Sequence, residues 1–219
     1  MQIAVVGGTA GLGRALALRL AHAGADVVVG SREEAKATSV AKELSDKLDR
    51  PVEGKANQDA VRGVDVTLVA VPFPGLAPTY AVIKEGLSPG AVVIDCNVPL
   101  ASEVGGKATR LLGVWEGSAA QAGKAILGKD FHMAAGFHSV MAGKLEALDT
   151  PLQMDILVCG DAEGKAVAEQ VVSLIDGARF VDCGPLERAR ILESITALLI
   201  GINSRYKLQP GAGIRITGL

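Results

Sequence analysis

Aromatic side chains are scarce in this sequence: Phe, Trp and Tyr together make up 3% of its 219 residues. Proteins that hold single-stranded nucleic acid stack its bases on aromatic rings, so no platform of that kind is expected. The formal net charge is also small, at −2. Because no basic excess favours nucleic acid or an anionic membrane surface, we expect small-molecule partners.

Cysteine is equally sparse, and Cys96, Cys159 and Cys183 form no Cys-x-x-Cys pair or Cys/His cluster. An odd number of scattered cysteines indicates reduced, buried thiols rather than a disulfide framework or a zinc site. The segment QIAVVGG lacks the basic region of a secretory signal. The most apolar helical stretch, residues 191–202, contains Glu193 and is too short to span a bilayer. The sequence thus predicts a cytoplasmic protein without a metal site.

Short apolar runs that alternate with helical patterns are abundant. Strands are predicted at residues 3–6, 27–29, 51–55, 64–71, 91–94, 133–136, 155–159 and 179–182. Helices are predicted at about 11–23, 32–48, 76–86, 118–127, 162–176 and 186–207. Near-continuous apolar strands are typical of a parallel sheet that helices cover on both faces. We therefore expect an α/β fold with a Rossmann-type, doubly wound parallel sheet.

A glycine-rich turn joins the first predicted strand to the first predicted helix, in the sequence Gly7-Gly8-Thr9-Ala10-Gly11-Leu12-Gly13. Such a turn brings backbone N–H groups and a positive helix end to a pyrophosphate. With Gly8 and Gly13 as the outer glycines, Ala10 stands at the second glycine position, which requires an ordinary φ there. With Gly7, Gly11 and Gly13 as the glycines, the spacing is that of short-chain dehydrogenases. Both alternatives predict a bound dinucleotide.

The end of the second predicted strand distinguishes NAD from NADP. An NAD enzyme places an acidic residue there to accept a hydrogen bond from the ribose 2′-hydroxyl. This strand ends in Ser31 and Arg32 instead, and Lys36 follows one helical turn later. A hydroxyl and two cations suit a 2′-phosphate, which a carboxylate would repel. The sequence therefore predicts NADP.

The pattern is interrupted near residues 148–153, where Asp149, Thr150 and Pro151 follow one another. The β-α-β-α block beyond this point either continues the sheet or forms a separate unit. We place a boundary here. Residues 1–150 are expected to form the NADP-binding Rossmann domain, and residues 151–219 a small C-terminal domain that completes the cleft and makes a dimer contact.

Candidate catalytic side chains are few. Tyr80 and Lys84 have the Y-x-x-x-K spacing of a short-chain dehydrogenase proton relay, but no Ser lies about a dozen residues upstream. His138 follows a predicted strand end, where cleft residues collect. No paired carboxylates, Ser-His-Asp order or metal-ligand spacing stands out. Direct hydride transfer between two cofactors needs positioning more than acid–base groups, so no catalytic residue is assigned beyond a possible positioning role for His138.

Segments along nearly the whole chain resemble the coenzyme F420:NADP oxidoreductases. The matching segments include Val5-Val6-Gly7-Gly8-Thr9, Val28-Val29-Gly30-Ser31-Arg32, Ala70-Val71-Pro72, Val98-Pro99, Gly117-Ser118-Ala119-Ala120, His138-Ser139-Val140, Val158-Cys159-Gly160-Asp161, Gly184-Pro185-Leu186 and Glu193-Ser194. Ala10 stands where the family usually has glycine, and the loop Phe73-Pro74-Gly75 differs from that of archaeal members.

The resemblance implies a Rossmann domain with a small C-terminal domain, usually in a homodimer or a dimer of dimers, and hydride transfer between NADP(H) and an 8-hydroxy-5-deazaflavin. It also implies roles for the matching residues. Thr9 to Leu12 would hold the pyrophosphate, with Gly8 and Gly13 shaping the turn, and Ser31, Arg32 and Lys36 would hold the 2′-phosphate. The set that would line the cofactor cleft beyond these is Val71, Pro72, Phe73, Ala77, Val98, Pro99, His138 and Ser139.

Two other functions remain open from the sequence. An NADPH-dependent reductase of another acceptor, such as a flavin or a ferric chelate, would share the NADP half of the site. A non-catalytic NADPH-binding sensor would bind the nucleotide without turnover.

Overall fold

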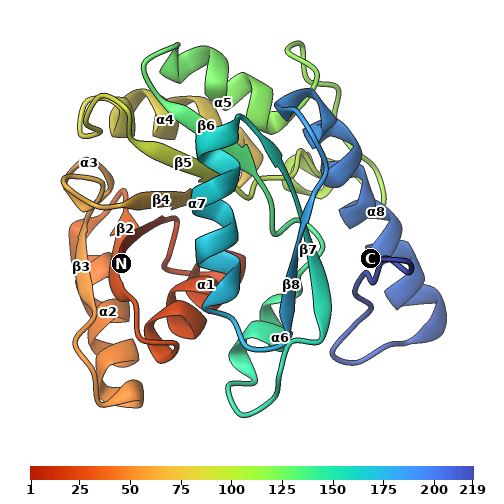
Figure 1. The fold of residues 1–219 in the computed structure, drawn as a ribbon, viewed down its shortest axis with the longest axis horizontal. Helices are drawn as coiled ribbons and strands as arrows, with labels where there is room; N and C mark the ends of the chain where they lie inside the picture. Colours follow the sequence, from red (N-terminus) through yellow and green to blue (C-terminus); the bar gives the residue numbers. More distant parts are fainter.

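The computed structural model describes residues 1–219, which form one eight-stranded sheet with helices on both faces (Figure 1). The strand order is β3-β2-β1-β4-β5-β6-β7-β8. The strands are β1 (Gln2–Val6), β2 (Asp26–Ser31), β3 (Glu53–Ala56), β4 (Val66–Val69), β5 (Val92–Asp95), β6 (His132–Ala135), β7 (Met154–Gly160) and β8 (Ala178–Asp182). This order, with parallel pairing from β3 to β6, confirms the predicted doubly wound α/β fold.

Eight helices surround the sheet. They are α1 (Gly11–His22), α2 (Glu34–Leu48), α3 (Asn57–Ala60), α4 (Leu76–Lys84), α5 (Ala119–Leu127), α6 (Ala142–Glu146), α7 (Ala162–Ser173) and α8 (Ala189–Tyr206). Short 3-10 turns, η1 (Phe73–Gly75), η2 (Ala101–Val104) and η3 (Leu186–Arg188), lie between them. None of these helices combines the length and apolar character needed to cross a membrane.

Two hydrophobic cores lie on opposite faces of the sheet, and β1 supplies both. Ile3 and Val5 belong to the larger core, which α1, α2 and α7 cover. Ala4 and Val6 belong to a smaller core, which includes residues of α4 and α5. Successive side chains of a strand point to opposite faces, so a strand buried on both sides reads as an unbroken apolar run. This explains why the apolar pattern located the sheet well.

Strand β7 departs from the parallel arrangement, because it pairs antiparallel with β6 through Ala134–Gly160 and Ala135–Cys159. Parallel neighbours need a long crossover, usually helical, whereas the 18 residues between these strands hold only the five-residue helix α6. Ile156 and Val158 of β7 belong to the same core as β1. Residues 151–219 thus extend the sheet of the first part, and their treatment as a separate domain stays a prediction.

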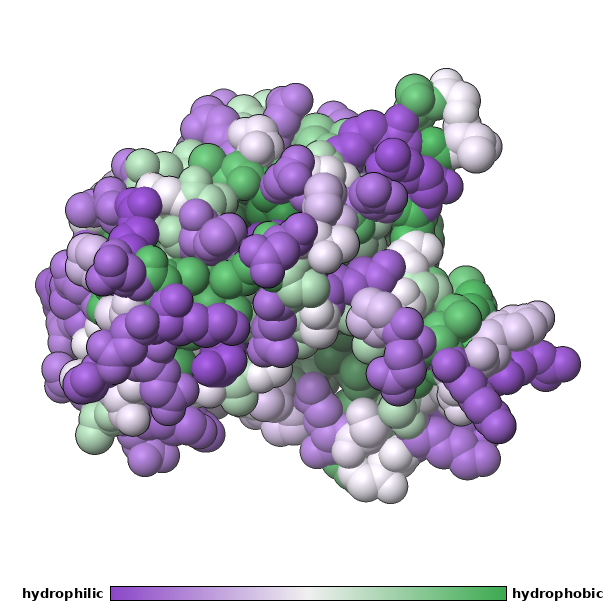
Figure 2. Space-filling model, turned by 90° about the horizontal axis from the view of Figure 1, so that it is seen from below, coloured by the Kyte–Doolittle hydropathy of each residue, from purple (hydrophilic) through white to green (hydrophobic).

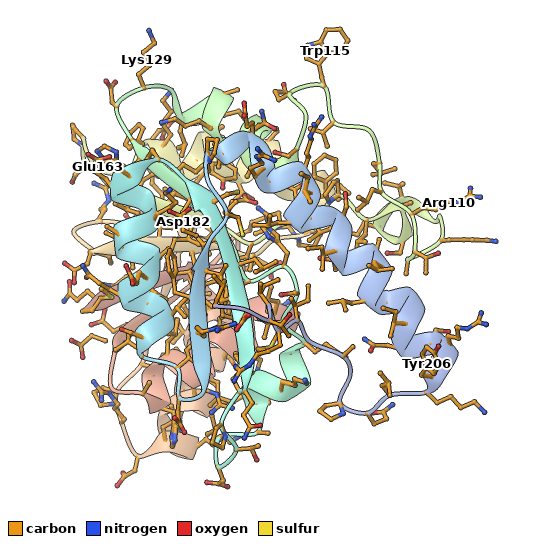
Figure 3. All side chains as sticks on the ribbon, turned by 45° about the vertical axis from the view of Figure 1, so that its right-hand side comes forward. Arg110, Trp115, Lys129, Glu163, Asp182 and Tyr206 are labelled. Atoms are coloured by element: carbon orange, nitrogen blue, oxygen red, sulfur yellow. The ribbon has the colours of Figure 1, made fainter.

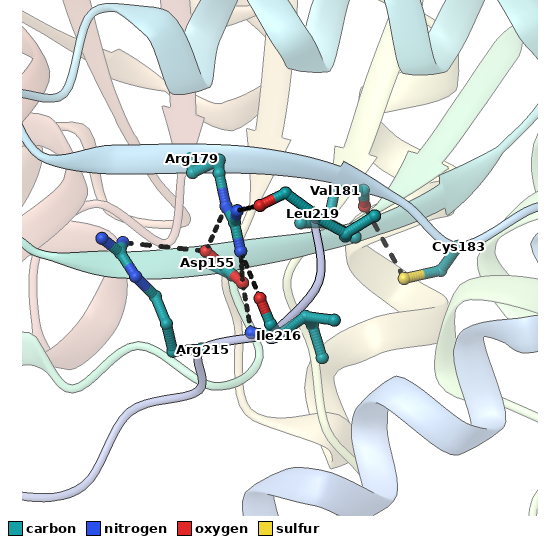
Figure 4. A network of polar contacts seen from close by, with 7 residues as sticks. All are labelled: Asp155, Arg179, Val181, Cys183, Arg215, Ile216 and Leu219. Atoms are coloured by element: carbon teal, nitrogen blue, oxygen red, sulfur yellow. Dashed lines mark hydrogen bonds and ion pairs between the residues drawn. The ribbon is translucent and has the colours of Figure 1, made fainter.

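The C-terminal tail is held to β7 by Asp155, whose carboxylate is fully buried (Figure 4). Arg179 of β8 donates from Nε and Nη2 to the two oxygens of Asp155, at 2.8 and 2.6 Å. The backbone N–H of Ile216 donates to the same carboxylate at 2.6 Å, and the Arg179 guanidinium also donates to the carbonyls of Ile216 and Leu219. One carboxylate and one guanidinium therefore fix the last residues of the chain.

We expect this link to weaken in acid. Hydrogen bonds from Arg179 hold the pKa of Asp155 below its ordinary value. A depressed acid pKa contributes stability above the unfolded-state pKa of about 3.9, and that contribution is lost as the pH falls through the folded pKa. The free energy of unfolding can be measured with urea from neutral pH down to about pH 3. We expect it to fall less steeply with decreasing pH in Asp155→Asn than in the wild type. Replacement of the exposed Asp130 by Asn should leave the wild-type pH dependence unchanged. The same pH dependence in all three proteins would contradict the prediction.

Candidate active site

A cleft of about 760 Å³ opens at the carboxyl ends of the central strands. Its walls come from the turn after β1, the end of β2, the loop after β4 and the segment after β5. The strand order reverses at β1 and β4, and α/β sheets bind ligands at such a switch point. His138 and Thr196 of α8 close the far side. The hollowed face in Figure 2 carries both hydrophilic and hydrophobic residues.

The glycine turn fits tightly against β4. Gly7 has a φ of +80°, and a Cβ added to it would lie 2.3 Å from the carbonyl oxygen of Ala70. Ala10 is extended, with φ −158° and ψ 165°. Gly11 takes the left-handed conformation, with φ +51° and no atom near its missing Cβ. Ala10 is therefore accommodated without strain, because the left-handed conformation falls on Gly7 and Gly11 and not on residue 10.

The N-terminus of α1 is open toward the cleft. Thr9, Ala10, Gly11 and Leu12 all line it. No side chain caps the first turn of this 12-residue helix, so its N–H groups have no side-chain partner. Unpaired N–H groups and the positive end of the helix dipole together form an anion site.

Two free cations stand at the end of β2. Arg32 and Lys36 are exposed, line the cleft and make no ion pair. Ser31 is 8% exposed, and its Oγ accepts a hydrogen bond from the N–H of Glu33. Beside them, Asn57 leaves its buried Oδ1 without a partner. These groups have the chemistry to hold a phosphorylated ribose, and neither cation is held by an ion pair, although Glu33 lines the same cleft.

A hydrogen-bonded chain fixes the floor of the cleft. The N–H of Val71 donates to Asn97 Oδ1 at 2.7 Å. Asn97 Nδ2 and Tyr80 Oη each donate to Asp95 Oδ2 at 2.6 Å. Tyr80 is fully buried, and Lys84 donates to the carbonyl of Ile126. The short-chain dehydrogenase relay is therefore not assembled, because Tyr80 serves to position Asp95.

Three buried ionisable groups lie together behind this floor: Asp95, His138 and Glu193. Burial raises the pKa of Asp95 to about 6 and the pKa of Glu193 to about 8. Burial also lowers the pKa of His138 to about 4. Both oxygens of Glu193 accept hydrogen bonds from the N–H groups of Ala119 and Ala120, at 3.1 and 3.2 Å. Glu193 thereby joins α8 to the start of α5.

The structure brings most of the predicted site residues to the cleft. Those that line it are Thr9, Ala10, Gly11, Leu12, Ser31, Arg32, Lys36, Val71, Pro72, Val98 and His138. The residues that do not line it are Gly8, Gly13, Phe73, Ala77, Pro99 and Ser139. Gly8 and Gly13 are packed inside the turn, where an added Cβ would meet Val5 O at 2.7 Å or Gly7 O at 2.4 Å.

The sequence did not point to several cleft residues. They include Glu33, Asn57, Pro78, Thr79, Cys96, Asn97, Glu103 and Thr196. Asn97 and Asp95 offered one signal, because polar residues there end an otherwise apolar strand. Asn57 and Thr196 offered none, since they reach the cleft from segments distant in the chain.

Comparison with known proteins identifies the family. Residues 2–99 match the family described as NADP oxidoreductase coenzyme F420-dependent. The chain is 43% identical to the F420-dependent NADP reductase of Methanocaldococcus jannaschii over 225 residues, which cover 100% of this chain and 99% of that protein. It belongs to the F420-dependent NADP reductase family.

Other members agree with this assignment. The F420-dependent NADP reductase of Methanothermobacter marburgensis is 39% identical over 100% of this chain and 99% of its own length. A crystal structure from Arthrobacter sp. FB24, provisionally described as an F420-dependent NADP reductase, superposes with a TM-score of 0.79 over 98% of both chains at 22% identity. At that identity the likeness shows the fold alone. Together these relatives confirm the resemblance and the fold predicted from the sequence.

Proposed function

We propose that this enzyme transfers a hydride between NADP(H) and coenzyme F420, an 8-hydroxy-5-deazaflavin. The choice of NADP as one substrate rests on one observation. The free cations Arg32 and Lys36 stand at the strand end where an NAD enzyme has an acidic residue. Membership of a family whose relatives are named F420-dependent NADP reductases supports the deazaflavin half.

Several features of the cleft support NADP binding. The open N-terminus of α1 suits the pyrophosphate, and Gly7 lines the same part of the cleft. Ser31, Arg32 and Lys36 would hold the 2′-phosphate, and the unpaired Asn57 Oδ1 can accept a hydrogen bond from the bound nucleotide. Val71, Pro72 and Val98 would then flank the nicotinamide. Each of these assignments is a proposal about a binding residue.

The protein's part in the reaction is positioning. When bound, the nicotinamide and the deazaflavin supply the carbon atoms between which hydride moves. The chain provides a rigid floor, because Asn97 clamps the Val71 backbone to Asp95. His138, Val140 and Thr196 form the wall opposite the glycine turn. Holding two rings at reactive distance on fixed elements accounts for much of the rate enhancement in reactions of this kind.

The direct test follows loss of the oxidised deazaflavin absorbance after mixing with enzyme and NADPH, beside parallel reactions with NADH and with FMN. Turnover with NADPH and the deazaflavin supports the proposal. Turnover with FMN or a ferric chelate but not with the deazaflavin would favour a reductase of another acceptor. Tight NADPH binding without any turnover would favour a sensor.

We further propose that the enzyme is a homodimer built on α8 and the loop 105–117. Leu198 on α8 is 62% exposed, and Trp115 at the loop tip is 98% exposed. Figure 3 shows Trp115 pointing away from the body of the protein. A groove of about 460 Å³ runs between α8 and this loop, and its lining includes Ala197 and Gly201, small residues that let another helix approach closely. An exposed apolar surface of this kind is typical of an interface between subunits.

If this face makes the dimer, Leu198→Asp should shift the protein to monomer, because a carboxylate in an apolar interface is costly to desolvate. Sedimentation equilibrium gives the mass directly. Val82→Asp is the matched control, because Val82 is also exposed, at 44%, on α4. A dimer that survives Leu198→Asp would contradict the proposal. A cytoplasmic location and the lack of nucleic-acid partners stay predictions.

A further inference from the structure

Two buried carboxyl groups behind the cleft have no cation to balance them. Asp95 is 0% exposed and Glu193 is 1% exposed. One oxygen of each, and one ring nitrogen of His138, lie within 4.8 Å of one another. No lysine or arginine side chain bonds to any of the three. Two carboxylates this close in a low-dielectric interior cannot both stay ionised, so one holds a proton.

The hydrogen bonds indicate which one. Asp95 accepts three, from Tyr80 Oη, Asn97 Nδ2 and the Asn97 backbone N–H, and each favours its ionised form. Glu193 accepts two backbone bonds, but burial raises its pKa to about 8, and the charge of Asp95 adds to the rise. At neutral pH Asp95 is therefore charged and Glu193 is protonated.

The other titratable groups around Glu193 do not change this assignment. They are Tyr80 of α4, Cys159 of β7 and His138 after β6, besides Asp95 of β5. Burial raises the pKa of Tyr80 above its ordinary value and that of the Cys159 thiol to about 12, so both keep their protons. Burial keeps His138 neutral at working pH.

His138 lies between this buried proton and the cleft. The residue lines the cleft and is 6% exposed, and its two ring nitrogens are buried without a hydrogen-bond partner in the protein. A neutral imidazole carries a proton on one nitrogen and a lone pair on the other. It can therefore accept a proton on one side and release a different one on the other, and a single water molecule can span the distance to Glu193.

Reduction of a deazaflavin by NADPH consumes one proton as well as one hydride. We propose that Glu193, paired with the charge of Asp95, stores this proton and delivers it to the acceptor through His138. The inference rests on the proposed function and extends it. Glu193 acts through His138 and is a positioning residue for the proton rather than a catalytic residue.

The step balances in the direction of deazaflavin reduction. The O–H bond of Glu193 breaks and its proton passes to the bridging water, which gives one of its own protons to the near nitrogen of His138. The N–H bond on the far nitrogen breaks at the same time, and that proton goes to the acceptor. The electron pair travels with the hydride from NADPH, which is oxidised, to the deazaflavin, which is reduced. Glu193 is left briefly as a carboxylate beside ionised Asp95, and His138 is left in its other tautomer. Because two buried carboxylates do not both stay ionised, Glu193 regains a proton from solvent as the imidazole returns to its first tautomer. In the reverse direction the same groups remove the proton.

The first test needs neither coenzyme. Carbon-13 NMR of the protein labelled at the glutamate carboxyl carbon should show one resonance that titrates near pH 8 and is missing from Glu193→Gln. A Glu193 resonance that titrates at the ordinary glutamate value, about 4.3, would overturn the inference. So would a divalent metal bound at one equivalent, because a cation would neutralise both carboxylates and leave no proton to deliver.

The second test is kinetic. Glu193→Gln should lower kcat for deazaflavin reduction by about tenfold or more, since positioned proton donors typically contribute at least this much. We expect kcat of the wild type to fall as the pH rises through about 8, and Glu193→Gln should abolish this fall. The KM for NADPH should stay within about twofold, because Glu193 lies outside the nucleotide-binding part of the cleft. Glu187→Gln, an exposed change on η3, should behave as wild type.

The outcomes separate the two proposals. If the wild type reduces the deazaflavin and Glu193→Gln does so with the same kcat, the proton assignment alone is overturned. A wild-type enzyme that binds NADPH and does not reduce the deazaflavin overturns the proposed function and this inference with it.

Discussion

Replacing Arg32 with alanine should weaken NADPH binding by about 10- to 100-fold and leave NADH binding nearly unchanged. Charge-assisted hydrogen bonds to a phosphate contribute roughly 1.5–3 kcal/mol, which corresponds to that range. NADH lacks the 2′-phosphate, so it loses nothing when the guanidinium is removed. Arg32 is exposed and makes no ion pair, so its loss should leave the fold intact.

Fluorescence titration with NADPH and with NADH measures both affinities directly. Arg62→Ala is the matched control. Arg62 is also exposed, and it forms a surface ion pair with Asp59 away from the cleft. An equal loss for both nucleotides would mean that Arg32 supports the site as a whole. No loss for either would remove the basis for NADP preference at this position.

Replacing Gly7 with alanine should destabilise the protein by about 3 kcal/mol or more. An alanine held at positive φ costs roughly 1–2 kcal/mol, and overpacking against a fixed neighbour adds roughly 1–3 kcal/mol. The new Cβ would lie 2.3 Å from the Ala70 carbonyl oxygen, which belongs to the backbone and cannot rotate away. For a chain of this size the change corresponds to a fall in Tm of roughly 6–12 °C.

Gly63→Ala separates the two contributions. Gly63 has a similar φ of +69°, but nothing lies within 4 Å of its missing Cβ. Calorimetry should show a loss of about 1–2 kcal/mol for this variant, the part due to backbone conformation. Equal losses for Gly7→Ala and Gly63→Ala would mean that the contact with β4 relaxes at little cost. Gly7→Ala should also weaken NADPH binding, since Gly7 lines the cleft.

The sequence predicted the features that depend on local order. An apolar strand, a glycine turn and a helix start are read from consecutive residues, and so are Ser31 and Arg32 at the end of the second strand. The short helices α3 and α6, of four and five residues, were not predicted, because a helical period needs a longer run to be visible.

The buried polar network could not be predicted, because its members come from distant segments. Glu193 meets Ala119 from 74 positions away, and Tyr80 meets Asp95 across helix and strand. In the sequence, Glu193 was visible as a charge that interrupts an apolar helix and as part of one segment that resembles the family. A charged residue in that position needs a buried partner, and this was the signal available for finding it.

The antiparallel junction of β6 and β7 has a consequence for dividing the chain. The two strands meet through two residue pairs, at Ala134 and Ala135, both fully buried. A fragment that ended at residue 150 would lack β7 and would expose β6 as an open sheet edge with unpaired backbone groups. Uncovered apolar edges recruit strands from other molecules, so such a fragment would aggregate. We therefore expect the last third of the chain, whose β7 pairs with β6, to keep this sheet from self-association.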